Sequence, residues 1–85
     1  MKKFNYIIKD QIGIHARPAS LLVKKAQKYE SKVTIESKGE SSDAKKLMAV
    51  LSMGIKCGDE VIITIEGNDE NQVYTELPNF FSEHL

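Results

Sequence analysis

The chain has 85 residues, 41% of them hydrophobic, and its twelve Lys and Arg residues balance twelve Asp and Glu residues. This length predicts one small domain spanning residues 1–85, and the zero net charge argues against broad nucleic-acid binding, which needs a basic surface. No apolar run is long enough to cross a membrane, no signal-peptide pattern is present, and the lone Cys57 excludes an internal disulfide, so we expect a cytoplasmic protein.

The first half of the sequence predicts a strand, a helix and a hairpin. Apolar and polar residues alternate over residues 4–8, as in a half-buried strand. From residue 16 to about residue 29, apolar residues recur at helical spacing. They are Ala19, Leu22, Val23 and Ala26. Alternation over 32–36 predicts a second strand, and a turn at Gly39 leads to a short returning strand at 41–42.

The second half predicts a short helix, a strand and a longer helix. The short helix bears Leu47, Met48, Val50 and Leu51 and would stop at Gly54. Alternation over 61–66 predicts the last strand. Asp69 and Gln72 have the spacing of a capping box, which would open the third helix. Because a proline removes one helical hydrogen bond, we expect this helix to bend or end just before Pro78. Its apolar members are Val73, Leu77, Phe80 and Phe81.

The resulting order, β-α-β-β-α-β-α, predicts an α+β fold. The elements suit an open-faced β-sandwich, in which three helices pack on one face of a four-stranded, mainly antiparallel sheet.

The segment from Gly13 to Ser20 carries the strongest chemical signal. His15 stands just before the first predicted helix, and Pro18 suits the first helical turn, where an amide hydrogen would have no partner. Unpaired amides at a helix N-terminus attract anions, and the fork of donors on Arg17 matches phosphate oxygens. An imidazole is largely unprotonated at neutral pH and is then nucleophilic. This pattern predicts phosphoryl transfer to His15, with phosphate held by Ala16 and Arg17.

Other chemistry-bearing residues lack such a context. His84 stands near the end of the chain, and we expect it to be exposed without a role. One cysteine and two distant histidines do not make a metal-ligand spacing, so we expect neither a metal nor a cofactor.

The motif Gly-Ile-His-Ala-Arg-Pro-Ala at 13–19 resembles the active-site signature of the HPr family. These are the histidine-containing phosphocarriers of the bacterial phosphoenolpyruvate:sugar phosphotransferase system. The resemblance continues at 37–39, 44–55 and 67–70, and so runs the length of the chain. It implies the fold described above and a monomer that accepts phosphate on His15 from enzyme I and donates it to enzyme IIA domains. Such a carrier takes part covalently in transfer without being a free-standing enzyme.

The resemblance also implies a docking surface around the histidine and the short second helix. By position it would include Ser20, Lys24, Gln27, Leu47, Met48 and Leu51. Apolar residues ringed by basic ones suit a transient, electrostatically steered interface. The alternative is that Leu47 and Leu51 belong to the core and face the sheet.

Three residues depart from the family pattern. Lys46 occupies the position of a serine that a dedicated kinase phosphorylates in Gram-positive relatives, so we expect no regulatory serine there. A lysine cannot cap helix amides, and Asp43 or Ser42 would have to cap the short helix. Ile12 replaces a small polar residue near the histidine, and Pro78 is the third departure.

Two other functions stay open on the sequence. One is an HPr-like regulatory binding module outside sugar transport, which would dock transcription factors or metabolic enzymes. The other is a small-molecule-binding α+β domain, although no pocket motif supports it.

Overall fold

The computed structural model describes residues 1–85, which form four strands and three helices. In chain order these are β1 (Lys2–Ile7), α1 (Ala16–Gln27), β2 (Lys32–Ser37), β3 (Glu40–Asp43), α2 (Leu47–Leu51), β4 (Glu60–Glu66) and α3 (Glu70–His84). The predicted element order is confirmed, and each predicted element lies within a few residues of its observed bounds.

The four strands form one sheet in the order β1-β4-β2-β3, with every neighbouring pair antiparallel. Ile63 of β4 stands opposite Phe4 of β1 on one side and Ile35 of β2 on the other. Because side chains alternate along a strand, one face of the sheet collects the apolar residues. The fully buried ones on the two central strands are Val33, Ile35, Val61, Ile63 and Ile65.

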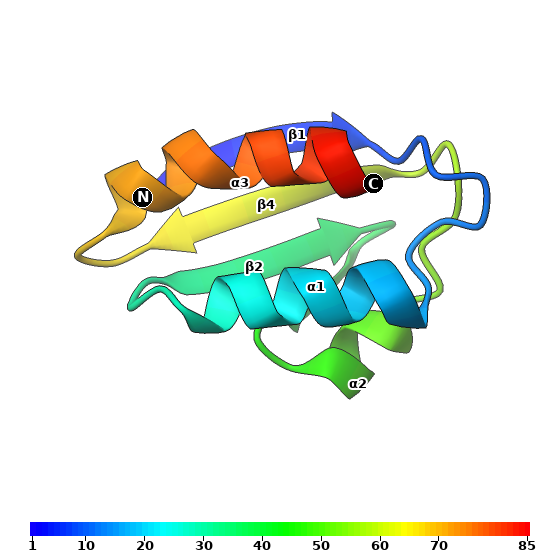
Figure 1. The fold of residues 1–85 in the computed structure, drawn as a ribbon, viewed down its shortest axis with the longest axis horizontal. Coiled ribbons are helices and arrows are strands. Elements are labelled where there is room, and N and C mark those ends of the chain that lie inside the picture. Colours follow the sequence, from blue (N-terminus) through cyan, green and yellow to red (C-terminus); the bar gives the residue numbers. More distant parts are fainter.

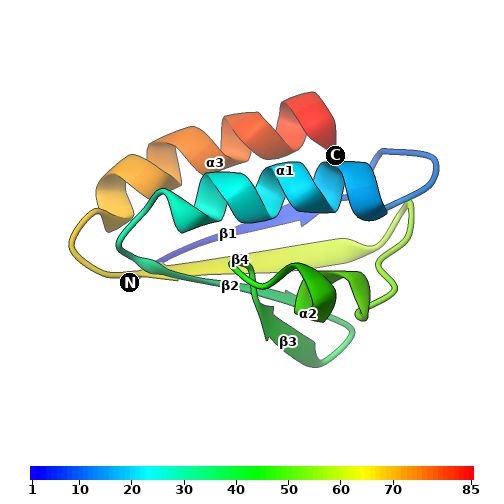
Figure 2. The same ribbon diagram turned by 60° about the horizontal axis from the view of Figure 1, so that its bottom comes forward.

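The helices cover that apolar face and leave the other face of the sheet open. Figure 2 shows α1 and α3 over the sheet, with α2 beside α1 near the β3 edge. The buried stripe of α1 is the predicted one together with Pro18, and α3 contributes Val73, Leu77 and Phe81. The open-faced arrangement is therefore confirmed. None of the three helices is long and apolar enough to cross a membrane.

We expected α3 to bend or to end near Leu77. The helix continues through Pro78 as far as His84, so the second of these expectations is wrong. Leu77 and Phe81, on either side of the proline, are both fully buried. The Phe81 ring packs edge-on against the rings of Phe4 and Tyr6, with centroids 5.6 and 5.5 Å away. Packing on both sides of Pro78 therefore offsets the hydrogen bond that the proline cannot make.

The start of α3 also differs from expectation, because Asp69 is the N-cap residue but its side chain does not cap the helix. Its carboxylate instead accepts hydrogen bonds from the amides of Glu30 and Ser31, each at 2.9 Å, and from the Ser31 hydroxyl. These bonds, led by that of the hydroxyl, hold the pKa of Asp69 below its usual value. The predicted capping box is absent, and the carboxylate fastens the loop after α1 to the start of α3.

Helix α2 has Lys46 as its N-cap residue and no side-chain cap, so the expected capping by Asp43 or Ser42 is wrong. The Asp43 carboxylate accepts from the Lys45 amide, which precedes the helix, at 2.9 Å. The Ser42 hydroxyl donates to the carbonyl of Ala49 at 3.3 Å. The first amides of α2 thus lack a side-chain acceptor.

Candidate active site

His15 lies at the start of α1 and is its N-cap residue, with an extended backbone (φ −109°, ψ −174°). Its ring makes no capping hydrogen bond and is half-buried, so it neither enters the core nor extends freely into solvent. Its main-chain oxygen accepts the Ala19 amide at 2.9 Å, which closes the first turn around Pro18. The imidazole is therefore available for reaction while its backbone is fixed.

The loop before His15 is positioned by a close contact with the segment after α2. Gly13 has a φ of +85°, and a Cβ added there would meet the Ile55 carbonyl oxygen and lie 2.7 Å from the Lys56 Cα. The next amide, of Ile14, donates to that same Ile55 oxygen at 3.0 Å. Only glycine suits both the dihedral and the space. The segment at 55–56 thus determines where His15 stands.

The amides of Ala16 and Arg17 belong to the first turn of α1, where the helix itself provides no acceptor. Pro18 has no amide hydrogen, so the free donors of this turn are confined to these two residues and lie next to His15. No acidic side chain occupies the first turn. No side chain of the turn itself therefore compensates the partial positive charge of the helix end, which favours an anion there.

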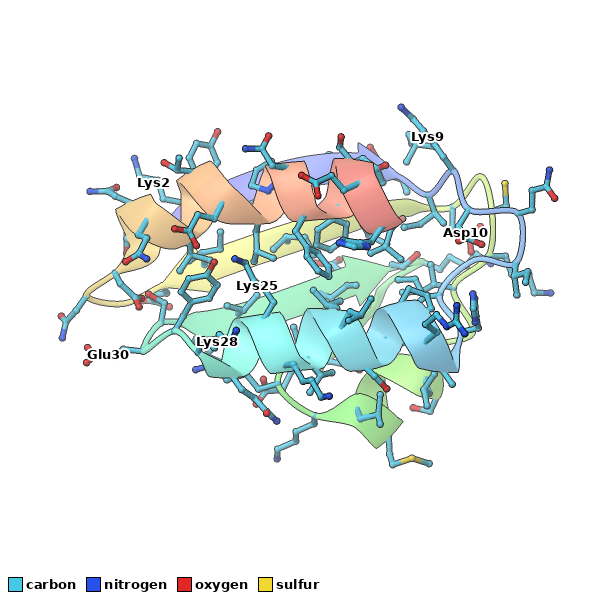
Figure 3. The ribbon with its side chains drawn as sticks, viewed as in Figure 1. Lys2, Lys9, Asp10, Lys25, Lys28 and Glu30 are labelled. Atoms are coloured by element: carbon cyan, nitrogen blue, oxygen red, sulfur yellow. The ribbon has the colours of Figure 1, made fainter.

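A hollow of about 220 Å³ adjoins this helix end. It is lined by Asp10, His15, Arg17, Pro18, Leu21 and His84. The chain brings these residues together because α1 and α3 run in opposite directions, so the start of α1 and the end of α3 share one end of the molecule (Figure 1). Figure 3 shows Asp10 in the loop at that same end.

The hollow includes His15 and Arg17, which the sequence singles out, and three residues that it does not. Asp10 lies in the loop after β1 and accepts the Ile12 amide at 2.9 Å, while Leu21 is one turn into α1. His84 is exposed, as expected, but it lines the hollow on the side of α3. Nothing in the local sequence around residue 84 signals this placement, because it arises from the packing of two distant helices.

The residues expected to dock partners lie on α1 and α2, which pack against each other. Met48 is 74% exposed, whereas Leu47 and Leu51 are partly buried against the core. Lys24 and Gln27 are exposed and Ser20 is half-buried. Gln27 also ties the two helices together, since its side-chain amide donates to the Lys45 carbonyl at 2.9 Å.

The loop before the histidine carries another exposed apolar side chain. Ile12, in the position where the family pattern has a small polar residue, is 69% exposed. Its side chain offers no hydrogen bond to the His15 ring.

Two features of this arrangement suit reversible phosphoryl transfer. An accessible imidazole can act as a nucleophile, and a guanidinium with free helix amides can neutralise the charge of phosphoryl oxygens. The hollow is open to solvent, so a group bound there stays within reach of a second protein. Such a site holds a phosphoryl group without enclosing it.

Comparison with known proteins agrees with this chemistry. The family described as "PTS HPr component phosphorylation site" matches residues 2–83. The phosphocarrier protein HPr of Mycoplasma capricolum is 46% identical over 72 residues, which are 85% of this chain and 81% of that protein. A solved Mycoplasma histidine-containing phosphocarrier protein superposes with a TM-score of 0.93 at 39% identity, covering 96% of this chain and 93% of that one.

Another matching structure is a dimer of HPr from Thermoanaerobacter tengcongensis, with a TM-score of 0.76, 34% identity and coverage of 98% and 95%. With its fold, its histidine at the start of α1 and a family match over nearly its full length, the chain belongs to the HPr family of histidine-containing phosphocarrier proteins.

Proposed function

We propose that this HPr-family protein accepts a phosphoryl group on His15 from phosphorylated enzyme I and donates it to sugar-specific enzyme IIA domains. It would do so in the cytoplasm, as a monomer, during phosphoenolpyruvate-dependent sugar uptake. The observation that carries this proposal is the position of the His15 ring, half-buried at the free N-terminus of α1 and in one hollow with Arg17.

The chemical step needs one unprotonated ring nitrogen of His15. Its lone pair forms a bond to phosphorus, while the bond from phosphorus to the donor atom of enzyme I breaks and the donor keeps that electron pair. Negative charge on the three phosphoryl oxygens is met by the Arg17 guanidinium and by the amides of Ala16 and Arg17. Donation to enzyme IIA is the reverse step with a new acceptor, and His15 regains its lone pair.

The test is to mix the protein with enzyme I and radiolabelled phosphoenolpyruvate. We expect a protein-bound label that is acid-labile and base-stable, that is lost from His15→Ala, and that passes to an added enzyme IIA domain. A wild-type protein that stays unlabelled would contradict the carrier function and favour the regulatory binding module.

Arg17 has a distinct expected signature in the same assay. Arg17→Gln keeps much of the stem but removes the charge-assisted hydrogen bonds, which are worth about 1.5–3 kcal/mol each. We therefore expect labelling to slow by about 10- to 100-fold while the final site stays His15. Lys28→Gln, which removes a charge from an exposed residue just beyond the other end of α1, is the matched control and should leave the rate nearly unchanged.

We further propose that the docking surface comprises Ser20, Lys24, Gln27, Leu47, Met48 and Leu51, as the exposed Met48 beside α1 supports. Met48→Asp should weaken transfer from enzyme I and to enzyme IIA without changing stability, because the native side chain is largely solvated. Sedimentation velocity tests the proposal that the protein is a monomer. A dimer at micromolar concentration would contradict that proposal.

Regulation by serine phosphorylation is not expected at position 46. Lysine cannot form a phosphoserine ester, and it occupies the N-cap position of α2. Incubation with the family's serine kinase and ATP, followed by mass spectrometry, should find no phosphoserine. Stoichiometric phosphoserine anywhere in residues 41–52 would contradict this part of the proposal.

A further inference from the structure

His84 shares the hollow with His15 but has no part in the transfer chemistry described above. The end of α3 that carries it is fastened to the loop before His15, because the main-chain oxygen of Leu85 accepts the amides of Lys9 and Asp10 at 2.7 and 2.9 Å. The His84 ring also packs against the Phe80 ring, with centroids 4.6 Å apart. These contacts keep the second imidazole at the wall of the hollow.

The charges of the hollow show what a second imidazole would do there. Among its lining residues the permanent charges are one carboxylate, Asp10, and one guanidinium, Arg17, which cancel. A phosphoryl group on His15 adds close to two negative charges near neutral pH. The one other imidazole of the lining is that of His84, and imidazoles in general can take up a proton near neutral pH.

We propose that His84 is the charge-compensating residue of the phosphorylated state: it binds a proton from solvent when His15 carries a phosphoryl group. No covalent bond of the chain changes in this step. Other charged groups face His84, namely Lys25 on α1 together with Glu76 and Glu83 on α3, which line a second hollow that His84 also borders. Lys25 and Glu76 form an ion pair at 3.4 Å, and all three groups are present whether or not His15 is phosphorylated. Figure 3 shows Lys25 between α1 and α3.

The size of the effect follows from Coulomb's law across an open hollow. In water, two charges about 10 Å from an imidazole shift the pH at which half of the rings are protonated, here called the ring midpoint, by about half a unit. Linkage is reciprocal, so a protonated His84 favours the phosphorylated form of His15 by the same factor, about threefold.

The inference rests on the proposed function, and the experiment separates the two. The protein, His84→Gln and His84→Lys are each equilibrated with enzyme I and a fixed ratio of phosphoenolpyruvate to pyruvate, at pH 6 and at pH 8.5. The ratio of phosphorylated to free protein is measured relative to wild type at each pH. The His84 ring midpoint is also followed by NMR in wild type, with and without the phosphoryl group.

At pH 6 the ratio should fall about threefold in His84→Gln and stay at the wild-type value in His84→Lys. At pH 8.5 it should be unchanged in His84→Gln and rise about threefold in His84→Lys. The ring midpoint in wild type should move up by about half a pH unit on phosphorylation.

If His84→Gln lowers the ratio of phosphorylated to free protein equally at both pH values, His84 has a structural or docking role and the inference is overturned. A wild-type ring midpoint that does not move on phosphorylation also overturns it. In both cases the carrier function stands, whereas a wild type that is never phosphorylated on His15 removes both proposals.

Discussion

Replacing Gly13 by alanine tests how the loop before α1 positions His15. At φ +85° an alanine backbone is strained by about 1–2 kcal/mol. The new methyl group would also meet the Ile55 carbonyl oxygen and the Lys56 Cα, and such overpacking costs about 1–3 kcal/mol more. The total is about 3 kcal/mol, which is less than the usual stability of a small domain, so the variant should still fold.

Gly58→Ala is the matched control, because Gly58 has a similar φ of +90° but open space where its Cβ would be. It should lose only the strain, about 1–2 kcal/mol. Urea unfolding of both variants measures the difference. We also expect Gly13→Ala, and not Gly58→Ala, to slow labelling of His15, because the loop must move to admit the methyl group. Equal losses of unfolding free energy in the two variants would refute the idea that contact with residues 55–56 places His15.

Three further changes probe the fold. Pro78→Ala should raise the free energy of unfolding by about 1–3 kcal/mol, because it restores a hydrogen bond inside α3. Thermal unfolding measures this change, and an unchanged Tm would mean that the packing around α3 already compensates for the proline. Lys46→Ser should stabilise by about 0.5–2 kcal/mol by capping α2, and unchanged urea unfolding would mean that the first amides of α2 gain nothing from the cap. The Asp69 carboxylate, held chiefly by the Ser31 hydroxyl, and the Glu76 carboxylate, held chiefly by the Tyr29 hydroxyl, both have lowered pKa values. The unfolded chain therefore binds more protons than the folded one between the two sets of pKa values, so stability present above about pH 4.5 should be lost as pH falls through the folded values. In Asp69→Asn the free energy of unfolding should fall less steeply as the pH is lowered. The same pH dependence as in wild type would mean that other groups cause the loss of stability in acid.

The elements and their order could be predicted because each carries a simple periodic pattern. Alternation over 61–66 and helical spacing over 16–29 reflect burial on one face, and the structure buries those faces. The end of α3 was predicted wrongly because a local rule about Pro78 was applied without the packing of Phe81, which only the tertiary structure provides.

The predictions of helix caps at α2 and α3 were wrong for a related reason. The spacing of Asp69 and Gln72 is typical of a capping box, but a carboxylate bonds the donors that the fold brings nearest, here the amides of Glu30 and Ser31. Those residues are about forty positions away along the sequence. Local patterns cannot reveal such partners.

The candidate site also contains residues that the sequence could predict and residues that only the tertiary structure brings together. His15 and Arg17 are visible in the sequence because they are two residues apart at the start of a helix. Asp10 and His84 join them in the hollow because α3 packs antiparallel to α1, which only the tertiary structure shows. The proposed role of His15 thus follows from one motif, whereas the charges around it could be identified only from the structure.

The most direct test of the account is to locate the phosphoryl group after transfer from enzyme I. Two imidazoles line one hollow, so the position of the label distinguishes a positioned nucleophile from mere proximity. Tandem mass spectrometry of peptides kept at alkaline pH should find phosphate on His15 alone, both in wild type and in His84→Gln. Phosphate on His84, or its appearance on His15→Ala, would contradict the assignment of His15 as the acceptor.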